Sequence, residues 1–204
     1  MHRDVPSPID LRQMSDARAW EASAMTKRPW RTEFFDRFAR EIARSTSSPC
    51  RVLELGSGPG FLAECLLRAL PTVEYVALDF SAAMHELARV RLGELASRVV
   101  FVERSFRESN WSHGLGSFGF VVTNQAVHEL RHKRYAVALH ARVQPLLAPG
   151  GVYLVCDHFA GEGGMSNAQL FMSIEEQETA LLDAGFGTVQ LLMVNGGLAL
   201  FSAT

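Results

Sequence analysis

Apolar residues in this chain form short continuous runs that alternate with segments of helical periodicity. Five of these runs have the length and composition of buried parallel strands. Strands that alternate with helices predict an α/β fold built on a doubly wound, mostly parallel sheet. The predicted strands cover residues 51–55, 73–79, 99–103, 118–124 and 152–157.

The pattern changes in the C-terminal part of the chain. Ser173 and Glu176 form a capping box, which predicts the start of a helix that Gly185 would end. Two further strands, at residues 189–194 and 198–201, flank Asn195-Gly196, a strong signal for a tight turn. We therefore expect the chain to close with an antiparallel hairpin.

The residues before the first strand have helical character. We expect one helix from Asp10 to about Met25 and a second that Thr32 caps, followed by a polar linker at residues 45–49. We interpret residues 1–48 as a helical arm that packs on a core domain formed by residues 49–204. Trp20 in this arm either closes over a bound ligand or packs against the core.

Three glycines at alternate positions, Gly56, Gly58 and Gly60, follow the first predicted strand, and Glu54 lies inside that strand. A turn without side chains lets a ligand approach the backbone, and the free N–H groups at the start of the next helix attract anionic or polar oxygens. The spacing is G-x-G-x-G, whereas the dinucleotide-binding fingerprint is G-x-G-x-x-G. It therefore argues against a nicotinamide-dependent dehydrogenase.

The stretch from Val52 to Gly60, VLELGSGPG, resembles the first motif of class I S-adenosylmethionine-dependent methyltransferases. The resemblance covers residues 50–204 and implies a seven-stranded Rossmann-like methyltransferase fold with S-adenosylmethionine as cofactor. It also implies that Gly56, Ser57, Gly58 and Gly60 hold the methionine part of the cofactor, with Glu54 near its ammonium group.

By the same resemblance, Asp79 lies at the end of the second strand and would bind the ribose hydroxyls. Ser105 stands where many family members have an acid, and Gly119 also replaces a usual acid, which weakens the match at both positions. The methyl group would lie at the loop that begins with Asn124. The residues expected to frame the adenine are Phe80, Met84, Ser105 and Phe106.

The loop after the fourth strand contains His128, the best-placed candidate for a general base; His158 is the next. A structural role for either histidine remains open and is the simpler interpretation. Residues 128–132 also spell the zinc motif H-E-x-x-H, which requires a helix; here it follows a strand, so we expect no metal site. The loop lacks the Asn/Asp-Pro-Pro-aromatic motif of many enzymes that methylate base or glutamine amino groups.

Composition narrows the class of acceptor. The net charge of -2 gives no electrostatic case for nucleic acid, and no apolar run approaches the ~20 residues that span a membrane. The odd number of cysteines, three, is typical of reduced thiols in a cytoplasmic protein. We expect a small-molecule methyl acceptor, while the oligomeric state is not readable from the sequence.

Three points stay open. All Lys and Arg residues lie at or before Arg142, which reflects either chance or a neutral to acidic face around the substrate entrance. The glycine-rich segment 159–171 is a candidate substrate lid. The alternatives to a methyltransferase are an aminopropyl transferase of related fold and a catalytically inactive relative that binds S-adenosylmethionine or another protein.

Overall fold

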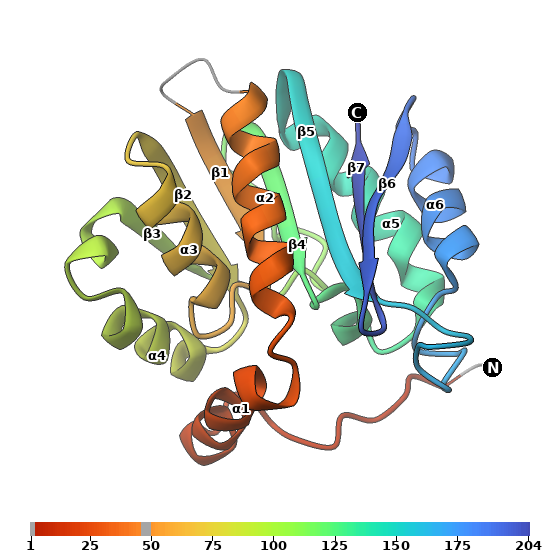
Figure 1. The fold of residues 1–204 in the computed structure, drawn as a ribbon, viewed down its shortest axis with the longest axis horizontal. Helices are drawn as coiled ribbons and strands as arrows, with labels where there is room; N and C mark the ends of the chain where they lie inside the picture. The colour runs from red at the N-terminus through yellow and green to blue at the C-terminus, as the bar shows by residue number, and fades with distance from the viewer. Residues whose placement is uncertain (1–2, 46–49) are drawn as a thin grey trace.

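The computed structural model describes residues 3–45 and 50–204. It contains one seven-stranded sheet in the order β3-β2-β1-β4-β5-β7-β6 (Figure 1). The first five strands are parallel, and β7 runs antiparallel to both β5 and β6. The predicted fold class is therefore confirmed. The strands are β1 Cys50–Leu55, β2 Val73–Asp79, β3 Val99–Glu103, β4 Phe118–Asn124, β5 Leu147–His158, β6 Val189–Asn195 and β7 Leu198–Ala203.

Helices cover both faces of the sheet. One hydrophobic cluster joins Val52 of β1 to α2 and α3, and the other joins Leu53 of β1 to α5 and α6. Neighbouring residues of β1 thus point into opposite cores, which is why the strand reads as a continuous apolar run. The helices are α1 Met14–Lys27, α2 Arg31–Ser45, α3 Phe61–Ala69, α4 Ala82–Leu92, α5 Ala136–Val143 and α6 Ile174–Asp183.

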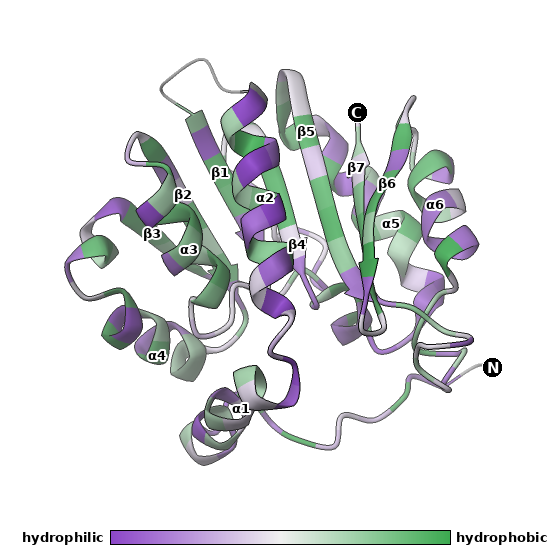
Figure 2. Ribbon diagram, in the orientation of Figure 1, coloured by the Kyte–Doolittle hydropathy of each residue, from purple (hydrophilic) through white to green (hydrophobic). Residues whose placement is uncertain are grey.

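Hydropathy follows these layers. Figure 2 shows apolar residues along the strands and hydrophilic ones on the outward face of α2. Within residues 3–45 and 50–204, no helix combines the length and apolar character needed to cross a membrane.

Local signals in the sequence were confirmed at the C-terminal end. The Ser173 hydroxyl accepts a hydrogen bond from the Glu176 N–H, and the Glu176 carboxylate accepts one from the Ser173 N–H, so the capping box is complete. The β6–β7 hairpin turns at Gly196 and Gly197, both at positive φ, one residue later than the predicted Asn195-Gly196 turn.

Two predicted helix starts were wrong. α1 begins at Met14 and not at Asp10, because Asp10 forms a turn in which its carboxylate accepts the Arg12 N–H. Thr32 does not cap α2, which begins one residue earlier at Arg31; the Thr32 hydroxyl donates back to the Pro29 carbonyl. The linker predicted at residues 45–49 began one residue too early, because α2 extends to Ser45; its residues 46–49, and with them the proposed boundary at 48/49, lie outside the described residues.

The first described part of the predicted helical arm, residues 3–13, crosses the edge of the sheet where the parallel strands end (Figure 1); we call this segment the N-terminal arm. The Val5 N–H donates to the Arg131 carbonyl at 2.8 Å, and the Arg131 guanidinium donates to the carbonyls of Val5 and Pro6 at 2.9 and 2.7 Å. At the other end of the arm, the Ser81 hydroxyl donates to the Leu11 carbonyl at 2.5 Å. These contacts hold the N-terminal arm across the carboxyl ends of the parallel strands.

Candidate active site

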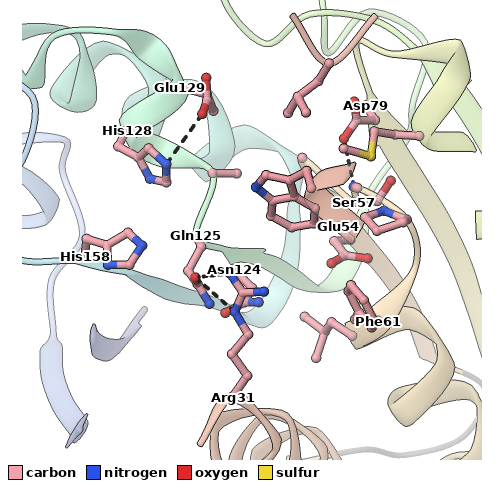
Figure 3. A pocket seen from close by; sticks show the side chains of 18 of the residues that line it. Arg31, Glu54, Ser57, Phe61, Asp79, Asn124, Gln125, His128, Glu129 and His158 are labelled. Atoms are coloured by element: carbon pink, nitrogen blue, oxygen red, sulfur yellow. Dashed lines mark hydrogen bonds and ion pairs between the residues drawn. The ribbon is translucent and has the colours of Figure 1, made fainter. Parts of the chain in front are cut away.

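A cavity of about 240 Å³ opens at the carboxyl ends of β1, β2, β4 and β5 (Figure 3). A second cavity of about 600 Å³ lies under the N-terminal arm. The two cavities share Leu11, Phe80, Phe106 and Glu129 as lining residues, so they lie next to each other. Carboxyl ends next to a change in strand order are where open α/β sheets bind ligands.

The glycine turn forms the floor of this site. The N–H groups of Gly56 and Ser57 both donate to the Leu78 carbonyl of β2, at 2.8 and 3.1 Å. Gly56 has a φ of +68°, and a Cβ there would lie 2.4 Å from the Cβ of Ala126 in the β4 loop. No larger residue fits between the two loops, so this glycine is required by both backbone conformation and space.

Gly60 lies at the point where α3 packs on α4. It precedes α3 at a φ of +81°, and a Cβ there would lie 3.2 Å from the Cβ of Ala88 on α4. Gly60 is not among the residues that line either cavity. Its position permits close packing of α3 on α4.

Asp79 holds the glycine turn in place from the end of β2. One carboxylate oxygen accepts the Gly58 N–H at 2.8 Å, and the other accepts the Ser81 N–H at 2.9 Å. Burial raises the pKa of Asp79 to about 6, although these backbone hydrogen bonds oppose the shift. Each oxygen keeps a further lone pair for a ligand in the cavity.

Glu54 is fully buried at the end of β1 and faces the same cavity. Its carboxylate accepts a hydrogen bond from the Tyr75 hydroxyl at 2.8 Å. Burial raises the pKa of Glu54 to about 8, and the nearby charge of Asp79 adds to the rise. A cationic ligand group would reverse this shift because it favours the carboxylate form.

The residues expected to frame an adenine are divided between the two cavities. Phe80 and Phe106 line both, Met84 lines the smaller one, and Ser105 lines only the larger one beneath the N-terminal arm. The Ser105 hydroxyl accepts the Arg107 N–H at 3.3 Å. The arm thus covers the part of the site that was expected to hold the adenine.

His128 forms a buried pair with Asp157. The distance between His128 Nδ1 and Asp157 Oδ1 is 2.7 Å, and the other carboxylate oxygen accepts the His128 N–H at 2.8 Å. Burial would lower the pKa of His128, but the charge and hydrogen bond of Asp157 outweigh it and raise the pKa. His128 Nε2 lies 3.5 Å from the Glu129 carboxylate, at the cavity.

The segment that spells H-E-x-x-H does not form the helix which the zinc motif requires. Val127–Leu130 is a single 3₁₀ turn, and Arg131 follows in the left-handed region at a φ of +67°. In the part of the chain that the structure describes, no three His, Cys, Asp or Glu side chains gather as metal ligands would.

Sequence reasoning missed Arg28, Arg31 and Gln125 as lining residues, and missed Asp157 as the partner of His128. Arg31 is 4% exposed and donates twice to the Gln125 Oε1, at 3.2 and 2.7 Å. Trp20, for which two roles were open, lines the cavity, with the Arg31 guanidinium 5.4 Å from its ring centre. A signal was available only for Asp157, which lies next to the end of β5, the strand beside β4.

The family model for a methyltransferase domain matches residues 52–151, from the first strand to the start of the fifth. The chain belongs to the class I S-adenosylmethionine-dependent methyltransferases. The suspected family is thus confirmed.

The curated proteins to which this chain is similar are named for different methylation substrates. The chain is 29% identical over 147 residues to the release factor glutamine methyltransferase of Escherichia coli, which covers 71% of this chain and 47% of the relative. It is 33% identical over 81 residues to the malonyl-[acyl-carrier protein] O-methyltransferase of Legionella pneumophila, covering 40% and 28%. The chain thus spans less than half the length of these curated relatives.

Solved methyltransferase structures share the fold. A putative O-methyltransferase from Nostoc punctiforme superposes with a TM-score of 0.71 at 19% identity, covering 90% of this chain and 59% of that one. The glycopeptide N-methyltransferase MtfA complexed with S-adenosylmethionine gives a TM-score of 0.62 at 19% identity, covering 81% and 91%.

Proposed function

We propose that this protein transfers a methyl group from S-adenosylmethionine to a small acceptor, with His128 as the general base that Asp157 orients. One observation carries the proposal: His128, whose Nδ1 pairs with the buried Asp157, lines the same cavity as the glycine turn and Asp79. A cofactor platform and a polarised base at one cavity are the two parts that methylation of a weakly acidic hydroxyl or amine needs.

The residues of the cavity fit S-adenosylmethionine. Asp79 has lone pairs left for two ribose hydroxyls, and Glu54 offers a buried carboxylate for the ammonium group. Ser57 Oγ and Asn124 Oδ1 are buried and have no hydrogen-bond partner within the described residues, so a polar ligand would satisfy them. Phe80, Met84, Ser105 and Phe106 would enclose the adenine, and the turn Gly56–Gly58 would lie under the methionine part.

The bound cofactor supplies a methyl group that its sulfonium already activates. The chain's own residues then align the acceptor and remove its proton. Because the Asp157 carboxylate binds Nδ1–H of His128, the lone pair of Nε2 is directed away from Asp157 and can take the acceptor proton. The Glu129 carboxylate, 3.5 Å from Nε2, stabilises the imidazolium that forms.

A small acceptor suits the covered cavity. The N-terminal arm, Trp20 and the two residues Met165 and Phe171 of segment 159–171 all border it, which limits access for a folded protein or a nucleic acid. The loop Asn124-Gln125-Ala126-Val127 has no prolines, unlike the motif of many enzymes that act on glutamine amides. We therefore do not extend the substrate of the release factor relative to this chain.

Calorimetric titration with S-adenosylmethionine tests the cofactor part of the proposal. We expect micromolar binding to the wild type and at least about tenfold weaker binding to Asp79→Asn, since each charged hydrogen bond lost costs about 1.5–3 kcal/mol. Asp183→Asn on the exposed face of α6 is the matched control and should bind like the wild type. Absence of binding by the wild type would refute the proposed function.

Turnover distinguishes an enzyme from an inactive relative that only binds the cofactor. Release of S-adenosylhomocysteine during incubation with a panel of small hydroxyl and amine compounds is the readout. The proposed base predicts that His128→Asn loses this turnover while its affinity for S-adenosylmethionine is unchanged.

A further inference from the structure

Basic groups gather in one corner of the cavity, where β4 and β5 end. Arg28 enters it from the residue after α1, Arg31 from the first residue of α2, and His158 from the end of β5 (Figure 3 shows Arg31 and His158). Arg31 is 4% and His158 7% exposed, and Arg28 is half-buried. Within residues 3–45 and 50–204, neither arginine forms an ion pair with a carboxylate; the partner of Arg31 is the neutral Gln125.

The two arginines lie close enough to repel one another, and their charges disfavour protonation of His158, which stays neutral near pH 7. Burial, together with the smaller effect of the Arg28 charge, lowers the pKa of Arg31 to about 10. Burial lowers the pKa of His158 to about 4; the charge of Asp157 opposes this shift, while His128 and both arginines add to it. Buried cations without a counter-ion destabilise the folded chain. A bound ligand of opposite charge would remove this destabilisation.

The uncharged groups of this corner also lack partners. Arg31 occupies the Gln125 Oε1, so the Gln125 Nε2 remains as a donor, and it is buried without a hydrogen-bond partner in the described residues. The same holds for His158 Nδ1. Gln125 has a φ of +57°, in the left-handed region that residues other than glycine rarely adopt. Strained backbone, free donors and uncompensated positive charge together describe a site for an anion.

The position of this corner points to the acceptor and not to the cofactor. The ring centres of His158 and His128 are 5.4 Å apart, and both rings pack against Phe171. Asp79, the proposed ribose ligand, ends β2, which β1 and β4 separate from β5 in the sheet. An anion bound at His158 would therefore lie next to the proposed base, at the far side of the cavity from the ribose.

We propose that Arg28, Arg31, Gln125 and His158 bind a carboxylate of the methyl acceptor. This inference rests on the proposed function. The acceptor is then a small acid whose methylated oxygen or nitrogen lies close to its carboxylate, because His128 and His158 are neighbours. Its negative charge also offsets the positive charge that the sulfonium of the donor brings into the cavity.

Matched pairs of acids and amides test the proposal. The probes are 2-hydroxybenzoate, 3-hydroxybenzoate and 2-hydroxy-3-phenylpropanoate, each compared with its primary amide, in calorimetric titrations of the protein saturated with S-adenosylhomocysteine. We expect at least one acid to bind about tenfold or more tightly than its amide. Arg28→Gln should abolish this preference, whereas Arg28→Lys should keep most of it. Arg18→Gln, at an exposed position of α1, is the matched control and should bind like the wild type.

A second titration identifies the source of the anion, since the methionine part of the cofactor also carries a carboxylate. The affinities for S-adenosylmethionine and for decarboxylated S-adenosylmethionine are compared in the wild type and in Arg28→Gln. If the substitution weakens only the cofactor that keeps its carboxylate, the corner belongs to the cofactor and the proposal is overturned. Equal binding of acids and amides, or no binding of either, also overturns it.

The two proposals fail in different ways. A wild type that does not bind S-adenosylhomocysteine refutes the methyltransferase function itself. A wild type that binds it but does not prefer acids refutes only the carboxylate site.

Discussion

Glu54 gives the sharpest test of how the cofactor site works. In the free protein its buried carboxyl group has a pKa of about 8, so only about one tenth of it is ionised at pH 7. If the ammonium group of S-adenosylmethionine binds beside it, the carboxylate form is favoured and the proton leaves. We expect binding at pH 7 to release about 0.9 proton from Glu54.

The release is measured by titrating S-adenosylmethionine at pH 7 in buffers that differ in ionisation enthalpy. The slope of observed enthalpy against buffer enthalpy gives the number of protons exchanged. Glu54→Gln keeps an acceptor for the Tyr75 hydroxyl and should release almost none. Glu103→Gln, at the exposed end of β3, should behave like the wild type. Equal proton release by wild type and Glu54→Gln would refute the assignment.

The same buried acid makes the stability of the free protein depend on pH. Its pKa rises from 4.5 to about 8 on folding, so between these values the unfolded chain loses a proton that the folded chain keeps. Folding stability therefore falls as the pH rises through this window, by as much as about 5 kcal/mol at 1.36 kcal/mol per pH unit. Denaturant unfolding should show Glu54→Gln gaining stability relative to the wild type as the pH rises from 4.5 to 8. A constant difference would contradict the buried, neutral carboxyl group.

Two further predictions concern the base and the glycine turn. The charge of Asp157 raises the pKa of His128, so the neutral base forms only as the pH rises through that raised value. Asp157→Asn should therefore move the inflection of kcat against pH to lower pH. It should also reduce kcat by about 10²–10⁴-fold. An unmoved inflection would mean that His128 is not the titrating base. Gly56→Ala should abolish cofactor binding and destabilise the fold by about 1–3 kcal/mol, because its Cβ collides with the β4 loop. Gly58→Ala, which has positive φ but open space around it, should cost less in thermal unfolding; equal losses would contradict the steric argument.

The sequence was sufficient wherever function depends on residues that are close along the chain. The glycine turn and the hairpin at Gly196 follow from short-range geometry, Asp79 was assigned by the family resemblance, and the order of strands and helices then implies the sheet. The first motif and the order of elements also pointed to the family. Helix starts were predicted less well. The turn at Asp10 and the start of α2 at Arg31 depend on local hydrogen bonds, which the hydrophobic periodicity does not indicate.

The residues of the proposed acceptor site could not be predicted from short-range patterns in the sequence. Arg28 follows α1 and Arg31 begins α2, and only the fold brings them to His158, more than 120 positions later. Asp157 reaches His128 because β4 and β5 are neighbours, with Asn124 paired to Cys156. The strand order implied by the family would have predicted that contact, whereas nothing in the sequence places the N-terminal arm over the adenine end.

The three tryptophans lie in three different environments. Trp111 is fully buried in the core, Trp30 packs against Gly196 at the hairpin, and Trp20 alone among them lines the cavity, beside the Arg31 guanidinium. Substituting phenylalanine for the first two would leave a single fluorophore whose emission depends on what enters the site. The fold thus contains its own optical reporter, with which cofactor exchange and acceptor entry can be timed in a stopped-flow instrument without any attached dye.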